Sequence, residues 1–339
     1  MSESKAASQA PAPTPPKADT KIPEVIFGPI YSRRFGTSLG IDLSPKSKQC
    51  NFDCLYCELE GQRAQASMQE VLPLESIIKE LEKKLTPNLD VLTITANGEP
   101  TLYPHLYELI CAIKERIPPH LKTLILSNGS RFGEPSVQRA LLLFDIVKFS
   151  LDGAQEREFL RIDRPHKSLK LEQIKQGILE FSRLYKGELI AEILLVQGVN
   201  DTQSNLKELA QTLSQINPKR IDLSTIDRPP AYKSKPLDSA SLAQIADFFK
   251  AQLPHIPIAL PTRPSQEDIT SQPQESRVQT PRISDLASLI DLIKRRPLEV
   301  HEAHAMLDER ALPLLHDALE SKQIFIQEIN GLRFYTTRI

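Results

Sequence analysis

The stretch Cys50-Asn51-Phe52-Asp53-Cys54-Leu55-Tyr56-Cys57 holds three of the four cysteines of this 339-residue chain. Their spacing is C-x3-C-x2-C, so three thiolates fall within eight residues. Three thiolates this close can bind three irons of a [4Fe–4S] cluster and leave the fourth iron without a protein ligand. An open metal position is typical of a catalytic site rather than a structural one. The spacing therefore predicts Cys50, Cys54 and Cys57 as the metal ligands of an open cluster.

Other uses of these cysteines fit the sequence less well. A structural zinc site normally has four ligands in two spaced pairs, and an electron-transfer ferredoxin uses a fourth thiolate. The remaining cysteine, Cys111, lies in the apolar run LICAI of residues 109–113, which predicts the buried face of a helix. A disulfide framework is not expected in a long chain with four cysteines and no secretory signal.

The overall charge argues against a broad attraction to polyanions. Lys and Arg number 42 and Asp and Glu 43, which gives a net charge of −1. Nucleic acid or an anionic membrane would therefore have to be bound by a local patch. No apolar run approaches the roughly 20 residues that span a bilayer. Because an exposed iron–sulfur cluster also needs reducing conditions, we predict a cytoplasmic protein without a membrane partner.

Composition divides the chain into four parts. Residues 1–22 are rich in Ala, Pro, Ser and Lys and are predicted to be a disordered tail. Residues 261–281 are also polar and proline-rich and are predicted to be a linker. Residues 23–260 between them are the predicted core domain, and residues 282–339 a small C-terminal domain.

The core alternates buried strands with amphipathic helices, which predicts parallel strands joined by right-handed crossovers. The predicted strands are Leu39–Leu43, Val91–Ala96, Lys122–Ser127, Ile146–Leu151, Leu189–Val196 and Arg220–Ser224. The predicted helices are Leu74–Leu85, Pro104–Arg116, Pro135–Phe144, Leu169–Tyr185, Gln203–Ile216 and Ser239–Leu253. Six such units predict an α/β fold, a partial and open (β/α)6 barrel.

Polar residues follow these strands at the ends where β/α barrels carry their reactive groups. The cysteine run follows the first strand and Asn97-Gly98-Glu99-Pro100 the second; Ser127 and Asn128 close the third, Ser150 and Asp152 the fourth, and Glu192 lies in the fifth. Plainer interpretations stay open: turns for the second and third groups, a helix cap for the fourth, and an outward salt-bridged carboxylate for Glu192.

The wider pattern resembles the radical S-adenosylmethionine (radical SAM) superfamily. The cysteine run with Tyr56 before its last cysteine is similar to the signature of that family, and Asn97–Pro100 to its GGEP element with Asn in place of the first Gly. The resemblance implies a partial barrel, a [4Fe–4S] cluster and S-adenosyl-L-methionine. It implies an external electron donor of the flavodoxin or ferredoxin type, which lets the cluster cleave S-adenosylmethionine into methionine and a 5′-deoxyadenosyl radical.

In this resemblance the strand-end residues contact the cofactor. Glu99 would accept the methionine ammonium, Ser127 and Asn128 the ribose or carboxylate, and Ser150 and Asp152 the ribose. The implied cofactor-binding set is Asn97, Gly98, Glu99, Pro100, Ser127, Asn128, Ser150, Asp152 and Glu192. No catalytic residue beyond the cluster is assigned.

Residues 27–43, 95–102 and 150–152 resemble the subgroup of the tRNA wyosine synthases (4-demethylwyosine synthase). Those enzymes use further cysteines for a second cluster, whereas this chain has only Cys111 left. The resemblance therefore does not extend to wyosine formation, and leaves RNA or nucleotide modification open.

Arginines beside the predicted barrel mouth have two interpretations. Arg33 and Arg34, Arg161 and Arg164, and Arg228 lie in loops, several next to proline. A guanidinium can hold a phosphate or carboxylate of a substrate through two hydrogen bonds. The alternative is structural ion pairing with Asp53, Asp163 or Asp227.

The C-terminal domain resembles a winged helix-turn-helix. Predicted helices at Asp285–Lys294, His301–Leu307 and Leu312–Ser321 precede a hairpin around Asn330-Gly331. Its eight basic and nine acidic residues make duplex DNA an unfavoured partner, and a docking or substrate-positioning role is expected. Three hypotheses therefore stand: a radical SAM enzyme, an iron–sulfur sensor-regulator that binds DNA, and a structural zinc protein.

Overall fold

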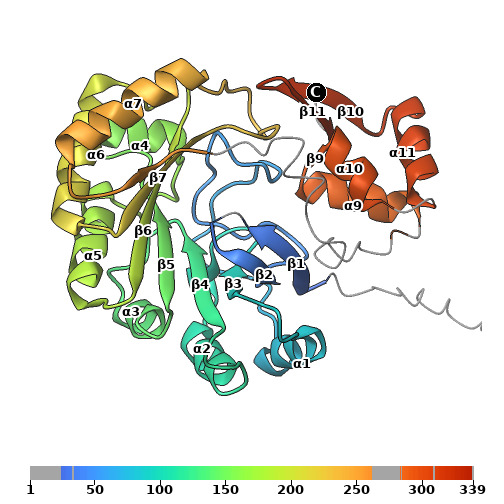
Figure 1. Ribbon diagram of the computed structural model, residues 1–339, viewed down its shortest axis with the longest axis horizontal. Helices are drawn as coiled ribbons and strands as arrows, with labels where there is room; N and C mark the ends of the chain where they lie inside the picture. Colours follow the sequence, from blue (N-terminus) through green and yellow to red (C-terminus); the bar gives the residue numbers. More distant parts are fainter. Residues whose placement is uncertain (1–23, 33, 262–282, 284, 308–309, 338–339) are drawn as a thin grey trace, which may run out of the picture.

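Residues 24–32, 34–261, 283, 285–307 and 310–337 are described by a computed structural model of the chain. They form a large α/β unit on an eight-stranded sheet and a small unit on a three-stranded sheet (Figure 1). The predicted tail and nearly all of the predicted linker lie outside the described residues. The domain boundaries drawn from composition therefore stay predictions.

The large sheet follows the order of the chain, from β1 to β8. Pairs from β2 to β8 are all parallel, and only β1 runs antiparallel to its neighbour. The strands are β1 (Ile26–Ser32), β2 (Gly36–Asp42), β3 (Val91–Thr95), β4 (Lys122–Ser127), β5 (Ile146–Ser150), β6 (Glu188–Leu195), β7 (Arg220–Thr225) and β8 (Ile258–Ala259). Strands β2 to β7 are the six predicted strands, so the partial barrel is confirmed.

Helices cover the outer side of this sheet (Figure 1). They are α1 (Leu74–Lys84), α2 (Leu106–Lys114), α3 (Pro135–Leu141), α4 (Glu156–Ile162), α5 (Leu171–Leu184), α6 (Gln203–Ile216) and α7 (Ser239–Gln252), with a 3-10 turn, η1 (Pro100–Leu102). Sequence analysis does not predict β1, α4 or β8. The reason is local: β1 contains the loop-like pair Gly28-Pro29, and β8 has only two residues. Helix α4 buries Glu158 and exposes Leu160, so its hydropathy pattern does not follow its buried face.

An aromatic cluster fills the core between α5 and the sheet. Phe181 of α5 has no exposed surface and stacks on Tyr185 with ring centroids 5.0 Å apart. It also meets Phe132 edge-on at 5.1 Å, and Phe132 in turn contacts Phe149 of β5 at 6.1 Å. Such pairs add to the free energy that burial of the rings supplies. The cluster fixes α5 on the strands whose ends carry Ser127 and Ser150.

The C-terminal unit has its own core. It comprises α9 (Leu286–Arg295), β9 (Leu298–Glu299), α10 (Val300–Met306), α11 (Ala311–Glu320), β10 (Phe325–Ile329) and β11 (Leu332–Thr336), and its sheet has the order β10-β11-β9. The predicted hairpin is present, with positive φ at both Asn330 (51°) and Gly331 (77°). The three helices and the hairpin match the prediction from sequence. Their assignment as a winged helix stays a prediction.

The hairpin of this unit packs on the barrel beside the cysteine loop. Ile329 and Phe334 share a buried cluster with Ile162 of α4, Val196 and Ile226, and Tyr56 lies against the same cluster. The Asn330 side chain also donates a hydrogen bond to the carbonyl oxygen of Ile226 at 3.1 Å. None of the helices in the described part of the chain has the length and apolar character that crossing a bilayer requires.

The aromatic cluster gives a stability prediction. Phe181→Ala removes a ring from a packed core, and we expect it to lower the free energy of unfolding by about 3–5 kcal/mol. Urea denaturation of the protein without bound iron measures the free energy of unfolding. Leu184→Ala is the matched control, because Leu184 lies on the same helix with 53% exposure, and it should change stability by less than about 1 kcal/mol. Equal losses in the two variants would contradict the packing described.

Candidate active site

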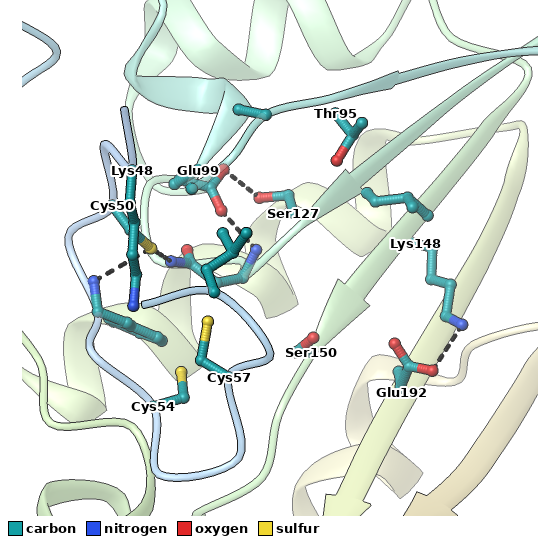
Figure 2. Close-up of a pocket in the computed structure, with 16 residues that line it drawn as sticks. Lys48, Cys50, Cys54, Cys57, Thr95, Glu99, Ser127, Lys148, Ser150 and Glu192 are labelled. Carbon is teal, nitrogen blue, oxygen red and sulfur yellow. Dashed lines mark hydrogen bonds and ion pairs between the residues drawn. The ribbon is translucent and has the colours of Figure 1, made fainter. Parts of the chain in front are cut away.

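The carboxyl ends of β3, β4, β5 and β6 meet the cysteine loop around a cavity of about 210 Å³. All three cysteines of the run line this cavity (Figure 2). The other lining residues are Lys48, Phe52, Leu59, Thr95, Ala96, Gly98, Glu99, Leu126, Ser127, Asn128, Lys148, Ser150 and Glu192. Six predicted cofactor-binding residues therefore line the same cavity as the three cysteines, as the parallel topology requires. They are Gly98, Glu99, Ser127, Asn128, Ser150 and Glu192.

The start of the cysteine loop is bonded to the end of β3 through backbone groups. Gln49 N–H donates to the Asn97 carbonyl at 2.8 Å, and Glu99 N–H donates to the Gln49 carbonyl at 3.0 Å. Gly98 between them has φ of 141°, and a Cβ there would lie 1.9 Å from the Gln49 oxygen. Only glycine fits this close approach. Asn97 and Pro100 do not line the cavity; Asn97 pairs with the loop and Pro100 begins η1.

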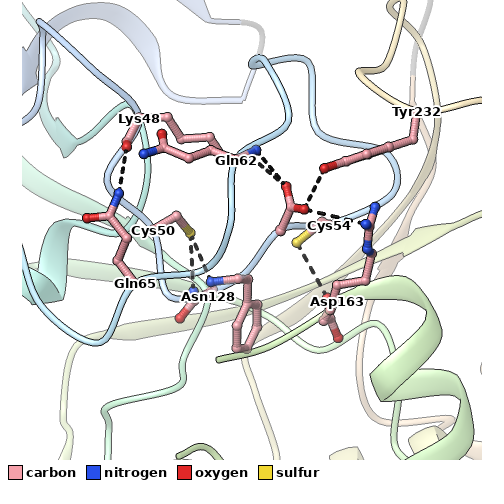
Figure 3. Close-up of polar contacts among 11 residues, drawn as sticks. Lys48, Cys50, Cys54, Gln62, Gln65, Asn128, Asp163 and Tyr232 are labelled. Carbon is pink, nitrogen blue, oxygen red and sulfur yellow. Dashed lines mark hydrogen bonds and ion pairs between the residues drawn. The ribbon is translucent and has the colours of Figure 1, made fainter. Parts of the chain in front are cut away.

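The strand β4 holds the loop from a second side. Asn128 Nδ2 donates to Asn51 Oδ1 at 2.8 Å, and Asn51 Nδ2 donates to Ser130 Oγ at 2.8 Å. Asn128 Nδ2 also lies 3.9 Å from the sulfur of Cys50 (Figure 3). The predicted role of Asn128 was contact with the cofactor. The structure adds a role in fixing the loop that carries the first cysteine.

The unpredicted helix α4 holds the loop from a third side. Leu55 N–H donates to the Ile162 carbonyl at 2.8 Å, and Asp53 N–H to the Asp163 carbonyl at 3.0 Å. His166 N–H donates back to the Asn51 carbonyl at 2.8 Å. These backbone bonds lie between segments more than 100 residues apart in the sequence. No sequence pattern marks them.

The three thiols suit a cluster better than a single metal ion. They are half-buried and free of disulfides. Among the described residues no three His, Cys, Asp or Glu side chains could hold one metal ion, whereas each thiolate of a cube binds a different iron. Burial, with the nearby charge of Glu99, raises the pKa of the Cys50 thiol to about 12. Iron binding would therefore release protons from these thiols.

Glu99 is buried, and protein donors already hold its carboxylate. Oε1 accepts hydrogen bonds from Ser127 Oγ at 2.7 Å and from both the N–H and the hydroxyl of Thr101, at 3.0 and 2.7 Å. Oε2 accepts from Asn128 N–H at 2.7 Å. Burial raises the pKa of Glu99, and these bonds oppose that rise. Oε1 thus accepts three hydrogen bonds and Oε2 one, so Oε2 has more remaining capacity to accept another.

Asp152 supports the cysteine loop instead of lining the cavity. It is 1% exposed, and its carboxylate accepts hydrogen bonds from Tyr56 O–H at 2.5 Å and from Leu194 N–H at 2.6 Å. Burial raises the pKa of Asp152 to about 7. The geometry gives Asp152 the task of fixing Tyr56, the residue before Cys57. Its predicted contact with a ribose remains without a structural argument.

One wall of the cavity carries an ion pair between Glu192, which was predicted from the sequence, and Lys148, which was not. Lys148 of β5 donates to Glu192 of β6 at 2.8 Å and lies 3.2 Å from Asp222 of β7. Glu192 thus faces the cavity with a partner, which favours the inward of its two interpretations (Figure 2). Ser150 lies beside it on the strand end. The sequence did contain a sign of this role, because Lys148 is a single charged residue in the otherwise apolar strand IVKFS.

Three of the four described arginines of the predicted clusters make ion pairs, and the fourth bonds to the backbone. Arg34 pairs with Asp222 at 2.5 Å, Arg164 with Asp53 at 3.7 Å and Arg228 with Glu58 at 3.2 Å. Arg161 donates to the backbone carbonyl of Gly198 at 3.2 Å, and Arg33 lies outside the described residues. The structural interpretation therefore accounts for these residues. Of the predicted partners, Asp53 pairs with Arg164, and the charge of Arg228 opposes the rise in pKa that burial gives Asp227.

Comparison with known families shows the superfamily to which the chain belongs. The model of the radical SAM superfamily matches residues 44–230, more than half of the chain. The chain belongs to the radical SAM superfamily. It is therefore an enzyme whose cofactors are a [4Fe–4S] cluster and S-adenosylmethionine, as predicted. The cluster and the bound cofactor supply a route to a 5′-deoxyadenosyl radical, and enzymes of this kind need an external reductant.

Three similar proteins place this radical SAM enzyme among its relatives. A UPF0026 protein of Helicobacter pylori is 48% identical over 316 residues, which cover 92% of this chain and 97% of that protein. A probable GTP 3′,8-cyclase of Thermococcus kodakarensis is 29% identical over 50% of this chain and 52% of its own. A radical SAM methyltransferase structure from Sphaerobacter thermophilus has a TM-score of 0.51 at 14% identity, over 66% of each chain, and shows the same fold.

The close approach at Gly98 gives a second prediction. In Gly98→Ala the new Cβ would collide with the Gln49 carbonyl at a backbone angle that alanine rarely adopts. The loop should move away from β3, so we expect iron content after anaerobic reconstitution to fall to less than half of the wild-type value. Gly331→Ala is the control, because its φ is also positive but nothing lies within 4 Å of a Cβ there. Full iron loading of Gly98→Ala would contradict the conclusion that the close approach at Gly98 holds the cysteine loop against β3.

Proposed function

We propose that Cys50, Cys54 and Cys57 bind one [4Fe–4S] cluster and that the adjoining cavity binds S-adenosylmethionine. The observation that carries this proposal is the shared cavity: three half-buried thiols and the polar strand ends of β3 to β6 line the same space. The donor set fits the cluster, because three thiolates leave one iron for the amino and carboxylate groups of the cofactor.

In this proposal the two sides of the cavity bind different parts of the cofactor. Glu99 Oε2 and the backbone around Gly98 lie next to the cysteine loop and suit the methionine ammonium, which needs an anionic or carbonyl acceptor. Ser150 and Glu192 lie across the cavity on β5 and β6 and suit the ribose hydroxyls. Ser127 and Asn128 act through Glu99 and Asn51, to which they donate hydrogen bonds.

The substrate that fits best is a nucleotide or an RNA nucleoside from which the radical abstracts a hydrogen atom. Two observations support this class. Beside Glu192 the cavity also offers the donor Lys148, which suits a polar base or a phosphate better than an apolar group. A relative that covers half of the chain is named for action on GTP. The hairpin of the C-terminal unit, docked beside Tyr56, would border the path of such a substrate.

No observation favours the sensor-regulator hypothesis. In the candidate recognition helix α11, Asp317 and Glu320 are exposed acidic residues, and both would repel DNA phosphates. The structural zinc hypothesis lacks a fourth ligand, since Cys111 lies on α2 and does not line the cavity with the other three cysteines. The sequence predicted Cys111 on the buried face of this helix, but it is half-buried and is not one of the buried residues of α2. The enzyme hypothesis is the one we carry forward.

Loss of single cysteines tests the ligand assignment. Cys50→Ala, Cys54→Ala and Cys57→Ala should each abolish the cluster, because the remaining two thiolates hold too few irons. Anaerobic reconstitution followed by iron and sulfide assays should give about four of each per wild-type chain and little in these variants. Cys111→Ala should load fully. Iron loss in Cys111→Ala alone would require a different ligand set.

Cleavage of the cofactor tests the second half of the proposal. The dithionite-reduced protein should convert S-adenosylmethionine into 5′-deoxyadenosine and methionine, slowly even without substrate, as followed by liquid chromatography. Glu99→Gln should weaken cofactor binding by about tenfold or more, because a charged hydrogen bond is lost. Glu70→Gln, an exposed carboxylate, should bind normally. Equal affinity in both variants would remove Glu99 from the cofactor site.

A further inference from the structure

Three segments bond to Asn51 and Asp53, two residues of the cysteine loop that do not line the cavity, and we call this side of the loop its outer face. Gln62 N–H donates to Asp53 Oδ1 at 3.2 Å, and Tyr232 O–H donates to Asp53 Oδ2 at 2.5 Å (Figure 3). His166 N–H donates to the Asn51 carbonyl at 2.8 Å. Residues 61–65, 164–168 and 231–235 therefore surround this outer face, although they are far apart in the sequence.

Every charged residue of these three segments is basic. Each anchoring residue has a cation as its neighbour in the sequence: Arg63 follows Gln62, Lys167 follows His166, and Lys233 follows Tyr232. Arg164 and Lys235 complete the set, and the segments contain no Asp or Glu. Arg63, Lys167, Lys233 and Lys235 are exposed, and Arg164 is half-buried. We call these five residues the basic collar.

The collar is a local departure from the balance of the chain, whose net charge is −1. The loop and the stretches that contain the three segments, residues 48–65, 161–168 and 227–235, hold eight basic and five acidic residues. Of the acidic residues, Asp163 is 4% exposed and Asp227 is exposed. Within the loop, Asp53 is 7% exposed and is paired with Lys48 and Arg164, and Glu58 is engaged by Arg228. Glu60 is exposed. A field of excess positive charge therefore lies over the outer face of the loop.

The five collar residues belong to the described part of the chain, and none of them lines the cavity. The cysteines line it from the loop itself. The collar therefore lies beside the loop that carries the three cysteines but outside the wall of the cavity in which the cofactor and substrate are proposed to bind. A partner seated on the collar could approach the cluster without competing with the substrate.

We propose that the basic collar is the docking surface for a small acidic protein that carries one electron at a time. This inference rests on the cluster assignment above. In the step it serves, the reduced carrier loses one electron, and the cluster gains it and passes from the 2+ to the 1+ state. Complementary charge raises the association rate of such transient pairs, by 10-fold to 1,000-fold, and does so less at high salt.

An RNA strand fits the collar less well. Protein–nucleic acid contacts often neutralise six to ten phosphates, and single strands usually gain affinity from bases stacked on exposed aromatic rings. The aromatic ring at the collar, Tyr232, is already covered by the Arg164 guanidinium 4.0 Å from its centroid. The collar also lies away from the cavity where a nucleoside would have to react. The observations therefore favour the electron carrier.

The test is a charge reversal with a matched control. The collar variant is Arg63→Glu, Lys167→Glu and Lys233→Glu together. The control is Lys79→Glu, Lys207→Glu and Lys219→Glu, three exposed lysines elsewhere on the barrel. Both change the net charge of the full chain by the same amount. None of the six residues belongs to the proposed cluster or cofactor site, so both variants should keep iron content and circular dichroism.

An acidic bacterial flavodoxin is the probe. Calorimetry with the oxidised flavodoxin gives its affinity, and anaerobic stopped-flow absorbance gives the rate at which the reduced flavodoxin reduces the cluster. The collar variant should bind at least tenfold more weakly than the control and be reduced at least tenfold more slowly at low salt. The difference should shrink at high salt. Reduction by dithionite, and the cofactor cleavage it supports, should be equal in all forms.

Three results would overturn the collar as a docking surface. The first is that the two variants bind flavodoxin with equal affinity and are reduced by it at equal rates. The second is that the unmodified protein does not bind flavodoxin. The third is that the collar variant binds flavodoxin as the unmodified protein does but no longer binds a single-stranded RNA oligonucleotide. The measurements with dithionite test the proposed function separately from this inference, because dithionite reduces the protein without a protein partner. Failure of cofactor cleavage with dithionite in the unmodified protein counts against the cluster assignment, whatever the collar does.

Discussion

The site depends on one backbone contact, the pairing of Gln49 with Asn97 and Glu99 across Gly98. It ties the start of the cysteine loop to the end of β3. Because a Cβ at Gly98 would lie 1.9 Å from the Gln49 oxygen, the contact exists only with glycine there. The same contact places Glu99 beside Cys50, so the anionic group and the first thiol share one wall of the cavity. Asn128 and α4 then fix the rest of the loop.

Buried carboxyl groups give this loop a second kind of support. Asp152 accepts a hydrogen bond from Tyr56, Asp53 accepts one from Tyr232, and Glu99 accepts four. A buried polar group is costly unless it is hydrogen-bonded, and a network with every member satisfied favours one geometry. The carboxyl groups of Asp53 and Asp152 thus hold the loop at points on either side of Cys54, whereas that of Glu99 ties the ends of β3 and β4 together. Such rigidity suits a cluster, whose irons require fixed sulfur positions.

The partial barrel was predictable because its signal is local and repeated. Strands β2 to β7 are apolar runs, and the helices between them have amphipathic periods long enough to recognise. The proposed cluster ligands could be picked out from the sequence because three thiols within eight residues have few other uses. The side-chain roles were less so. Glu99 and Asn128 bond to neighbouring protein groups, and Asp152 bonds to Tyr56 rather than lining the cavity, since hydrogen bonds between distant segments leave no mark on spacing.

The sequence by itself determined the repeated α/β pattern, the three thiols and their family. Only the tertiary structure showed that Lys148 meets Glu192, that the C-terminal hairpin packs beside Tyr56, and that α4 carries the loop. It also brought together the basic collar, whose members come from three loops separated by about 65 to 100 residues along the chain. The physical reason is that pattern and propensity act over neighbouring residues, whereas charge and hydrogen bonding act through space, between whichever segments the fold brings together.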